Sequence, residues 1–528
     1  MVEQIVLFLN PKLYRVDGMA NIDKIVDISK RRGIFWPSAE IYGGIAGFWN
    51  YGPIGVAIKN KLTDLWRKWF VRDECAYEIE TTDILPEIVW IASGHTEGFN
   101  DKQTECSKCH NRYRADHIIE EKLGKQEKLE GKNVEELTKI IKDNKIKCPK
   151  CGGKLSEVKI FNLMFGVNIG AIGETKAYLK PETTQSSVLD FPQVYRSQRE
   201  KLPLRIAQIG KSFRNEISPR NVFLRMREFS MAELQVFFNP QKTDIENFEK
   251  IKNYKIRILP VELREQGKEK EVEVTIEEAL DKKWVPNQLI AYYLVKVFRF
   301  FEEALEFNRR VLRFKELNKE EKAHYSKVHW DFEIYTEDFG WQEVVNNAWR
   351  SDYDLSRHQE YSKHQITVFE DGKHILPHMY EPSFGLDRII LHLLLNFYRE
   401  SPERTWLVLP KSLVPIEFAI FPLVNRDGLP DIAKKLKCEL DAEFTTFYDE
   451  NDSIGRRYRR ADEVGIPFSI TVDQNSKKEK TVTLRDVDSM KQVIVKIDSL
   501  SKVLKGLVTG KMQFEDAGKL VEKKQTEK

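Results

Sequence analysis

Residues 213–229 read Phe-Arg-Asn-Glu-Ile-Ser-Pro-Arg-Asn-Val-Phe-Leu-Arg-Met-Arg-Glu-Phe. Two strand-like runs flank a turn signal at Ser218-Pro219, a pattern typical of a β-hairpin. The sequence therefore predicts two antiparallel strands joined by a basic connection.

The side chains of this hairpin suggest the kind of ligand it could bind. Strand alternation predicts that Arg214 and Glu216 share one face of the first strand, and that Arg225, Arg227 and Phe229 share one face of the second. Guanidinium groups beside an aromatic ring suit a phosphate chain joined to a flat base. The hairpin alone also fits a surface ribbon with solvated charge, so the rest of the chain has to distinguish the two.

The composition is that of a globular chain with more than one domain. The protein has 528 residues, 41% of them hydrophobic, and its 85 Lys and Arg against 82 Asp and Glu give a net charge of +3. Collagen-like, low-complexity and disordered classes are excluded. We find no run of the ~20 apolar residues that a membrane helix needs and no secretory signal, so we expect a soluble, cytoplasmic protein with no membrane partner. With so small a net charge, any nucleic acid would be bound by local patches.

Four of the six cysteines form two CxxC pairs, Cys106 with Cys109 and Cys148 with Cys151. Two such turns can share one tetrahedral ion, and four sulfur ligands leave no position for an activated water. We therefore expect a structural zinc ion that holds residues 99–160 together. The alternative is two unrelated pairs of reduced cysteines.

No strong nucleotide-binding motif is present. The nearest phosphate-loop text, Gly506 to Lys511, is one residue short and is followed by Met512 where a hydroxyl should bind magnesium. A helix end explains it better. Metalloprotease, serine-hydrolase and dinucleotide fingerprints are also missing from the sequence.

Hydrophobic spacing and Gly or Pro breaks predict the organisation of the remaining chain. The expected features are helices at 21–32, after Pro53, from Gln288 to Phe314 and after Gly385, a strand from Tyr77 to Trp90 interrupted at Pro86, insertions at 99–160 and 241–328, a linker at 401–415, and a small α/β domain after it.

Three further strings match one family. Lys180-Pro181-Glu182-Thr183-Thr184-Gln185 precedes the hairpin, Met231-Ala232-Glu233-Leu234 ends it, and Glu381-Pro382-Ser383-Phe384-Gly385-Leu386-Asp387-Arg388 opens a late helix. With these strings the chain resembles the class II aminoacyl-tRNA synthetases, and within them the dimeric type of glycyl-tRNA synthetase, over about residues 20–510.

The resemblance implies an α+β fold in which an antiparallel-sheet catalytic core with insertions precedes a C-terminal α/β anticodon-binding domain. The implied boundaries are an N-terminal extension at 1–20, a catalytic domain at 21–410 with a zinc-binding insertion at 99–160 and a second insertion at 241–328, an anticodon-binding domain at 411–510, and a charged tail at 511–528.

The resemblance also implies how ATP and magnesium are bound. Arg214 would hold the α-phosphate and the substrate carboxylate, and Phe229 would stack on adenine with Glu216 nearby. Arg225 and Arg388 would hold the terminal phosphates. Glu343 matches a carboxylate that binds Mg²⁺ with ATP. Of these residues, those expected to be catalytic are Arg214, Glu216, Arg225 and Arg388.

Glycine offers no side chain to hold, so its selection has to come from exclusion. The resemblance implies that Glu182, Glu233 and Glu381, with Ser383, surround the glycine ammonium. Three carboxylates match three N–H donors and can crowd the space that a Cβ would need. Arg350 either lines this site or forms a structural ion pair.

The remaining implications concern macromolecular partners. Arg456 to Arg460, with Tyr458 among the arginines, either contacts tRNA(Gly) or forms a solvated helix face. The family is homodimeric, and residues 52–86 would form much of the interface.

The expected reaction is ATP-dependent ligation of glycine to tRNA(Gly) through a glycyl-adenylate, with release of AMP and pyrophosphate. Such chemistry orients reactants and neutralises charge, and it needs no protein nucleophile. The competing hypotheses are a synthetase-like tRNA-binding protein without ligase activity and a zinc-ribbon nucleic-acid binder.

Overall fold

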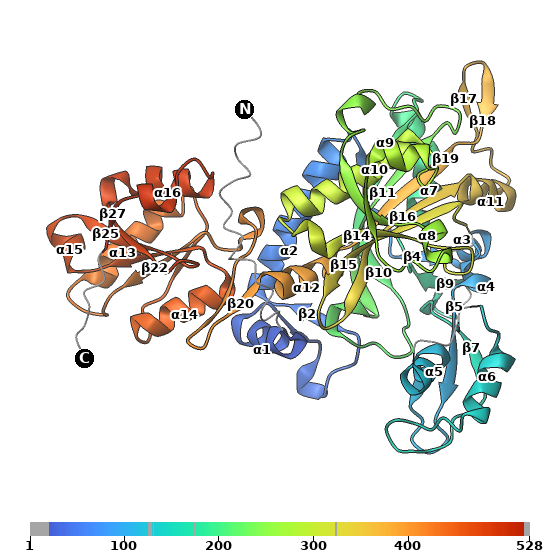
Figure 1. The fold of residues 1–528 in the computed structure, drawn as a ribbon, viewed down its shortest axis with the longest axis horizontal. Coiled ribbons are helices and arrows are strands. Elements are labelled where there is room, and N and C mark those ends of the chain that lie inside the picture. The colour runs from blue at the N-terminus through green and yellow to red at the C-terminus, as the bar shows by residue number, and fades with distance from the viewer. Residues whose placement is uncertain (1–20, 125–128, 130, 174, 323–324, 522–528) are drawn as a thin grey trace.

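The computed structural model describes residues 21–124, 129, 131–173, 175–322 and 325–521. The expected N-terminal extension lies outside these residues. The described chain forms a large central part, a small lobe from residues 100–162 at its lower right, and a C-terminal domain at the left of Figure 1.

The central part is built on one nine-stranded sheet with the order β13-β12-β14-β15-β16-β19-β11-β10-β3. Neighbouring strands are antiparallel except where β12 meets β14 and β10 meets β3. This sheet confirms the predicted α+β class. The strands are β3 (Tyr77–Ile79), β10 (Leu204–Phe213), β11 (Glu228–Phe238), β12 (Lys255–Leu259), β13 (Val272–Thr275), β14 (Leu312–Glu316), β15 (Val328–Thr336), β16 (Gly340–Ser351) and β19 (His378–Gly385).

Helices cover both faces of the sheet. Successive side chains of a strand point to opposite faces, and in the central strands both sets are apolar and must be buried. In β11, Val236 and Phe238 belong to the main core, whereas Phe237 packs into a second cluster on the other face. The main core includes α2 (Pro53–Trp66), α10 (Gln288–Arg299) and α12 (Leu386–Phe397). The second cluster includes α7 (Thr184–Ser197) and α11 (Tyr353–Ser362). The face between α7 and α11 is where the predicted glutamates lie.

Several local predictions are confirmed. Asn21 caps α1 (Ile22–Arg32), and Gly33 ends it in the left-handed region at φ 69°. Pro53 begins α2, where a missing N–H costs nothing. An antiparallel pair joined by the basic connection is present as β10 and β11, but the predicted strand positions are wrong, because β10 ends at Phe213 and β11 begins only at Glu228.

Other local predictions are wrong in their boundaries. The helix expected over 288–314 ends with a π-helical turn at Phe300–Ala304, and Leu312–Glu316 is strand β14. The sequence gives no sign of this change, because Leu312 and Phe314 are apolar and pack into the same core as the helix before them. Apolar residues in a short run do not distinguish a buried strand from a buried helix. Consequently residues 255–316, expected within a second insertion, supply three strands to the main sheet.

Two shorter segments also differ from expectation. Strand β4 (Ile84–Pro86) is followed directly by helix α3 (Glu87–Ala92), so Glu87 to Trp90, expected as strand, is helical. Pro86 has the extended backbone conformation that precedes the first turn of the helix. The expected linker at 401–415 contains β21 (Thr405–Leu407), which pairs with β20 (Tyr398–Glu400).

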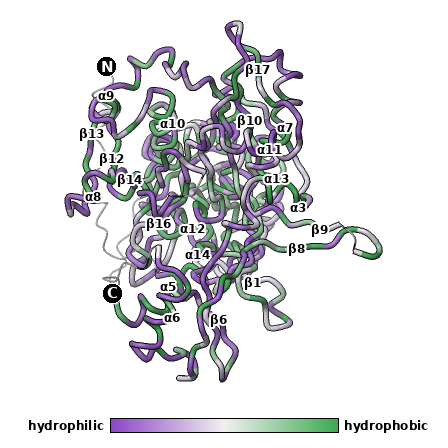
Figure 2. Tube along the Cα trace, turned by 90° about the vertical axis from the view of Figure 1, so that its right-hand side faces the viewer, coloured by the Kyte–Doolittle hydropathy of each residue, from purple (hydrophilic) through white to green (hydrophobic). Residues whose placement is uncertain are grey.

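The lobe has a small core of its own. A three-stranded sheet of β5 (Asn100–Glu105), β6 (Arg112–Arg114) and β7 (Lys159–Asn162) packs with α5 (Ala115–Leu123) and α6 (Val134–Asp143). Next to the lobe, β8 (Gly166–Ile169) and β9 (Thr175–Leu179) form a hairpin that extends away from the body of the molecule (Figure 2).

The C-terminal domain has a six-stranded sheet in the order β23-β22-β24-β25-β26-β27. Residues 514–520, expected in the tail, fold onto this domain through the β26–β27 pairing and the stacking of Phe514 on Phe468. The strands are β22 (Phe418–Pro422), β23 (Thr446–Tyr448), β24 (Phe468–Val472), β25 (Thr481–Asp486), β26 (Gln492–Lys496) and β27 (Lys519–Leu520), and the helices are α13 (Leu429–Leu440), α14 (Ile454–Val464), α15 (Gln474–Lys478) and α16 (Leu500–Val508).

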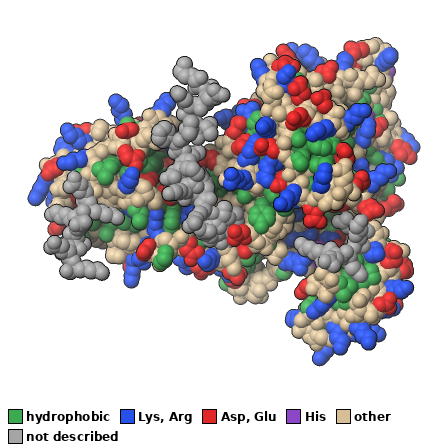
Figure 3. All heavy atoms as spheres, in the orientation of Figure 1, with side chains coloured by type: hydrophobic (Ala, Val, Ile, Leu, Met, Phe, Trp, Pro, Cys, Tyr) green, Lys and Arg blue, Asp and Glu red, His purple; other side chains and the backbone are tan. Residues whose placement is uncertain are grey.

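Charged side chains of both signs are interspersed over the face shown in Figure 3, as the small net charge leads one to expect. Within the described ranges, no helix has the length and apolar character required to cross a bilayer.

Candidate active site

A cavity of about 610 Å³ opens on the central sheet between β11, β16, β19 and the residue 214–227 connection. All eleven residues predicted for ATP, magnesium or glycine line it. They are Glu182, Arg214, Glu216, Arg225, Phe229, Glu233, Glu343, Arg350, Glu381, Ser383 and Arg388.

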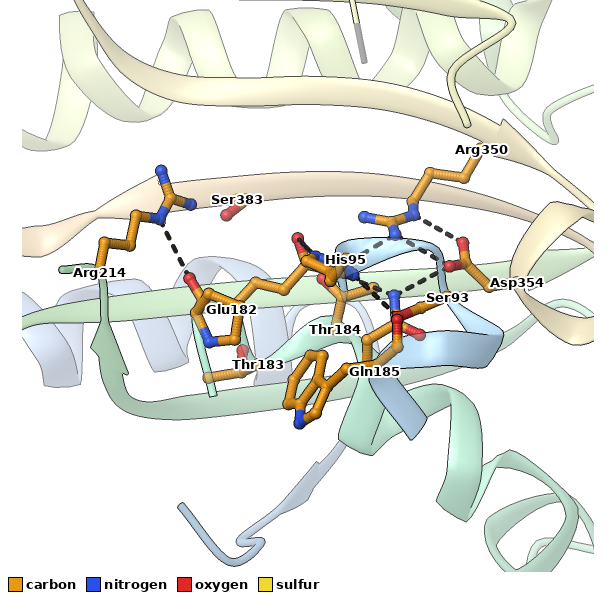
Figure 4. A network of polar contacts seen from close by, with 12 residues as sticks. Ser93, His95, Glu182, Thr183, Thr184, Gln185, Arg214, Arg350, Asp354 and Ser383 are labelled. Atoms are coloured by element: carbon orange, nitrogen blue, oxygen red, sulfur yellow. Dashed lines mark hydrogen bonds and ion pairs between the residues drawn. The ribbon is translucent and has the colours of Figure 1, made fainter. Parts of the chain in front are cut away.

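Strand register brings the acidic residues together at one end of this cavity. Glu233 on β11 is directly opposite Ser383 on β19, and Glu381 shares a strand face with Ser383 because the two are separated by one residue. Glu182 comes from the turn between β9 and α7. The three carboxylates, at most 8% exposed, therefore converge from three segments far apart in sequence. Figure 4 shows Glu182 with its neighbours Thr183, Thr184 and Gln185 and with Arg350 and Ser383 of the sheet.

Arg350 joins the acidic end into one network. The register of β16 with β19 shifts between Trp349 and Ser351, and Arg350 lies at that irregularity, 1% exposed. Its Nη1 donates to Glu381 Oε2 at 3.0 Å and its Nη2 to Glu182 Oε1 at 3.3 Å. It also forms a two-pronged ion pair with Asp354, at 2.7 and 2.9 Å. Arg350 thus both lines the cavity and makes structural ion pairs, so the two alternatives are not exclusive.

Hydroxyl groups surround Glu233. Ser383 donates to Glu233 Oε1 at 2.8 Å, and Thr184 donates to Oε2 at 3.0 Å. Thr183 also contacts Oε2, and Thr184 contacts Glu381 Oε1 as well. Short polar side chains therefore fill the space beside the carboxylates.

The carboxylates do not share one ionisation behaviour. Burial opposes ionisation of Glu182, but the charge of Arg350, together with His95 and the hydrogen bond from Gln185, lowers the pKa of this carboxyl. Burial, together with the charge of Glu182, raises the pKa of Glu233. Burial raises the pKa of Glu381 to about 8, although Arg350 opposes the shift.

The other end of the cavity is basic and aromatic. The guanidinium of Arg214 lies over the rings of Phe99 and Phe229, at 5.3 and 5.2 Å from their centroids, and Nε donates to Pro181 O at 3.2 Å. Arg225 Nε is 3.7 Å from Glu216 Oε2. One flat guanidinium stacked on Phe229 and a second within the same cavity suit a nucleotide with its phosphates.

The strand-face prediction for the arginines is wrong. β10 ends at Phe213 and β11 begins at Glu228, so Arg214, Glu216, Arg225 and Arg227 belong to the connection and not to strands. Arg227 instead donates to backbone carbonyls of Glu216 and Ala46. The connection follows its own hydrogen bonds, and strand alternation does not apply to it.

Arg388 and Glu343 form an ion pair in the lining of the cavity. Arg388 Nη1 donates to Glu343 Oε2 at 3.0 Å, and although burial opposes it, the charge of Arg388 lowers the pKa of Glu343. A second acid, Asp331, lies nearby, and its Oδ1 is 3.2 Å from His329 Nε2. Burial and the charge of Glu343 raise the pKa of Asp331 to about 6.

The four CxxC cysteines converge in the lobe. Their sulfur atoms all lie within 4.8 Å of one another, with Cys106 to Cys151 at 3.5 Å and Cys109 to Cys148 at 3.6 Å. A tetrahedral ion with Zn–S bonds of ~2.3 Å needs sulfurs about 3.8 Å apart, so the set fits zinc. A Cβ on Gly153 would lie 2.7 Å from Cys106 Sγ, which explains a glycine beside the sulfurs.

The arginine-rich helix α14 is only partly available to a partner. Arg457 is 2% exposed and donates to the carbonyls of Pro422 and Asp449. Tyr458 Oη pairs with Thr471 Oγ1, and Arg485 lies over its ring. The expected roles of Arg457 and Tyr458 in phosphate contact and base stacking are therefore wrong, whereas Arg456 and Arg459 are exposed.

Several residues of the acidic network were not predicted from the sequence. Gln185 Nε2 donates to Glu182 Oε1 at 3.0 Å and to Asp354 Oδ1 at 2.9 Å, and His95 Nε2 lies 3.6 Å from Glu182 Oε2. Tyr325 lies 3.7 Å from the Arg350 guanidinium. The sequence does indicate that Gln185 is buried. It lies one helical turn before the apolar Val188 and therefore on the inner face of α7.

Residues 171–397 match the family described as the tRNA synthetase class II core domain (G, H, P, S and T), and residues 417–507 match the anticodon binding domain. A prolyl-tRNA synthetase from Cryptosporidium parvum, solved with L-proline and AMP, has the same fold with a TM-score of 0.59 at 13% identity, over 93% of this chain and 76% of that one. The fold is that of a class II aminoacyl-tRNA synthetase.

Curated relatives identify the branch of this class. The glycine–tRNA ligase of Thermococcus gammatolerans is 41% identical over 92% of this chain and 98% of its own length, and that of Pyrococcus furiosus is 40% identical over the same shares. The enzyme of Methanocaldococcus jannaschii is 37% identical. The chain belongs to the glycine–tRNA ligases.

Proposed function

We propose that this protein ligates glycine to tRNA(Gly) with ATP, and that the cavity performs the activation step. The observation that carries the proposal is the acidic cluster of Glu182, Glu233 and Glu381 next to Arg214 in one cavity. A small ammonium ion fits the acidic end, and a nucleotide triphosphate fits the basic end. The proposal places the protein in the cytoplasm with its tRNA.

We propose that the acidic end of the cavity selects glycine because side chains leave no space there for a larger amino acid. The hydroxyls of Thr183, Thr184 and Ser383 occupy the space around Glu233, so a substituent on the α-carbon would displace hydrogen bonds. A missing methylene in an open pocket discriminates by only ~1–3 kcal/mol, whereas a methyl in a filled pocket adds a steric penalty. We propose that the carboxylates hold the glycine ammonium and exclude larger amino acids.

Activation is an in-line displacement at phosphorus. A glycine carboxylate oxygen bonds to the α-phosphorus of ATP, the bond from this phosphorus to the bridging oxygen breaks, and pyrophosphate leaves. We propose that Arg214 neutralises the α-phosphate, that Arg225 and Arg388 hold the leaving phosphates, and that Phe229 and Glu216 position adenine. The terminal ribose hydroxyl of tRNA then attacks the glycyl-adenylate and releases AMP.

Two metals fit the residues present. Class II synthetases use ATP with Mg²⁺, and the oxygen donors of Glu343 and Asp331 suit a hard cation. Burial and the charge of Glu343 raise the pKa of Asp331 to about 6, so a bound cation would favour its ionised form. Bound there, magnesium would neutralise phosphate charge. We propose zinc for the four cysteines, as a structural ion only.

A homodimer is the proposed assembly. Three large apolar side chains are exposed within the expected interface of residues 52–86: Val56 at 44%, Tyr77 at 38% and Ile84 at 42%. Large apolar side chains left exposed are typical of a subunit contact. The C-terminal domain would bind tRNA through exposed α14 arginines such as Arg459.

Amino-acid-dependent pyrophosphate exchange tests the function. We expect glycine to support exchange, and alanine and serine to fail. Arg214→Ala should lower the rate at least ~100-fold, because a charge-stabilising donor is lost. Arg426→Ala, at a residue whose side chain is 78% exposed in the C-terminal domain, is the matched control.

The same assay separates the alternatives. Exchange driven equally by another amino acid would refute the specificity. Absence of exchange from folded protein that still binds tRNA would favour a synthetase-like binding protein without ligase activity.

A further inference from the structure

The acidic end of the cavity holds more negative charge than its partners neutralise. Within the described part of the chain, the guanidinium of Arg350 contacts Glu182, Glu381 and Asp354, and the Thr184 hydroxyl links Glu381 to Glu233. Figure 4 shows Arg350 with Asp354, Glu182 and Thr184. All five residues are at most 8% exposed. Like charges this close and this well buried cannot all ionise without a large cost, so some of the carboxyls retain protons.

The position of Thr184 indicates which carboxyl that is. Its Oγ1 lies within hydrogen-bonding distance of Glu233 Oε2, at 3.0 Å, and also of Glu381 Oε1. One hydroxyl has one proton and can donate to only one of the two oxygens. If both carboxyls were ionised, the other contact would place two oxygen lone pairs against each other.

A proton on Glu381 resolves this conflict. Glu233 accepts from three hydroxyls, those of Thr183, Thr184 and Ser383, and so resembles a solvated carboxylate. Glu381 Oε2 accepts from Arg350, which leaves Oε1 to carry a proton and donate it to Thr184. The resulting chain runs from the Glu381 acid through the Thr184 hydroxyl to the Glu233 carboxylate, with every contact a hydrogen bond.

We infer that Glu381 carries a proton which the glycine ammonium displaces, so that glycine binding releases a proton to solvent. This inference rests on the proposed function, in which these carboxylates hold the ammonium. The O–H bond of Glu381 breaks, the proton passes to the buffer, and the new carboxylate accepts an ammonium N–H. Glycine itself stays a zwitterion throughout.

Charged and titratable groups face Glu381 from each packed element. They are Arg350 of β16, Glu233 of β11, Glu182 before α7, Asp354 of α11 beyond the guanidinium, His95 of α4 (His95–Gly98) beyond Glu182, and Tyr325 over Arg350. Burial, with the charges of Glu233 and Glu182, raises the pKa of Glu381 to about 8 in spite of Arg350.

The sign of the pH effect follows. Protein without glycine binds this proton below pH about 8 and the complex does not, so glycine affinity rises with pH and levels off once Glu381 ionises. The expected slope is about tenfold per pH unit between pH 6 and 7. A protonated Glu381 also explains how four acids can share one arginine.

Titration calorimetry of the full-length protein with glycine tests the inference. At pH 7, in two buffers of low and high ionisation enthalpy, the observed heats should differ by an amount equivalent to nearly one proton released per glycine. At pH 9 the difference should shrink toward zero. Glycine binding with no buffer dependence at pH 7 would overturn the inference and leave the proposed function intact, whereas absence of binding would count against both.

Infrared spectroscopy of Glu381→Gln locates the proton. Wild-type protein should show the carbonyl stretch of a protonated carboxylic acid, which glycine abolishes and the variant lacks. Glu360→Gln, at a side chain that is 63% exposed on α11, should leave the band unchanged. A band that persists in folded Glu381→Gln protein would place the proton on another group and refute the assignment. The wild-type calorimetry stands whether or not the variant folds.

Discussion

Arg350 is the residue on which the acidic end of the cavity depends. It is fully buried and pairs with Glu182, Glu381 and Asp354, and a ring of Tyr325 covers its guanidinium. Buried charges of this kind contribute little net stability as pairs, but loss of one partner leaves the others exposed to the full cost of desolvation. The guanidinium therefore makes the acidic cluster possible.

Replacement of Arg350 by methionine should destabilise the protein by roughly 3–5 kcal/mol, because three carboxyls lose their partner. Without Arg350, burial raises the folded-state pKa values of Glu182 and Glu381 above their unfolded values. The variant is most stable at low pH, where these carboxyls are protonated, and it loses stability as pH rises and they must ionise. The difference between the unfolding free energies of wild type and variant should therefore grow from pH 5 to 8. Urea unfolding at several pH values measures it.

Arg299→Met is the matched control for this substitution. Arg299 pairs with Glu303 on the surface, with side-chain exposures of 43% and 41%, and such a pair contributes at most ~1 kcal/mol. A deficit for Arg350→Met that is equal to the control, or that shrinks as pH rises, would contradict the role given to Arg350.

At the scale of elements, the cysteine lobe contacts the basic connection between β10 and β11. Ser218 Oγ donates to Arg112 O at 3.0 Å, and Arg220 Nη2 lies 2.8 Å from His117 Nδ1. Both lobe residues are close in sequence to the first CxxC pair. A folded lobe therefore supports the loop that carries Arg214 and Arg225.

Cys148→Ser should abolish zinc binding and unfold the lobe, since its core is small and includes two of the cysteines. We expect elemental analysis to show loss of zinc, limited proteolysis to cut within residues 99–160, and the KM for ATP to rise severalfold while the other domains stay folded. Cys438→Ser, at an exposed thiol, should change none of these. Zinc retained by Cys148→Ser would contradict the proposed site.

At the scale of the whole molecule, buried ion pairs connect the catalytic part to the C-terminal domain. Asp462 on α14 is 1% exposed and accepts from Arg485 at 2.7 and 2.9 Å and from Arg404 at 3.1 Å. Arg404 belongs to the turn between β20 and β21, outside that domain. Asp462 therefore joins the two parts.

Asp462→Ala should destabilise the C-terminal domain by roughly 3–5 kcal/mol, because two buried guanidiniums lose their carboxylate. Pyrophosphate exchange, which does not need tRNA, should stay within about twofold of wild type, whereas tRNA charging should fall. Calorimetry and the two activity assays measure these effects. Glu439→Ala, on the exposed face of α13, is the control. Equal loss of exchange and charging would show that the two parts do not act separately.

The proposed dimer also belongs to this scale. Ile84→Asp places a charge within the exposed apolar set of residues 52–86 and should shift sedimentation from dimer to monomer. Phe369→Asp, at a 62% exposed side chain on the hairpin of β17 (Val368–Glu370) and β18 (Lys373–Ile375), should leave the dimer intact. Dissociation by both variants, or by neither, would contradict the interface.

The sequence alone determined what depends on local chemistry. Spacing predicts an antiparallel pair joined by a basic connection, although not the bounds of its strands, and it predicts the helix starts at Asn21 and Pro53 and the paired cysteines. The motif strings, through the family resemblance that they carry, also supply eleven of the residues that line the cavity. Such features could be predicted because each is a property of a few neighbouring residues.

Only the tertiary structure decided which of these side chains meet. The contact from Thr184 to Glu381 joins residues 197 positions apart, and that from Arg350 to Glu182 joins residues 168 apart. Burial in the fold also turned Arg457 from an expected tRNA contact into an internal donor, and made Leu312–Glu316 a strand where apolar spacing indicated a helix. Segments distant in sequence determine which side chains contact each other and which are exposed to solvent. Hydrophobic periodicity and composition therefore do not predict these contacts.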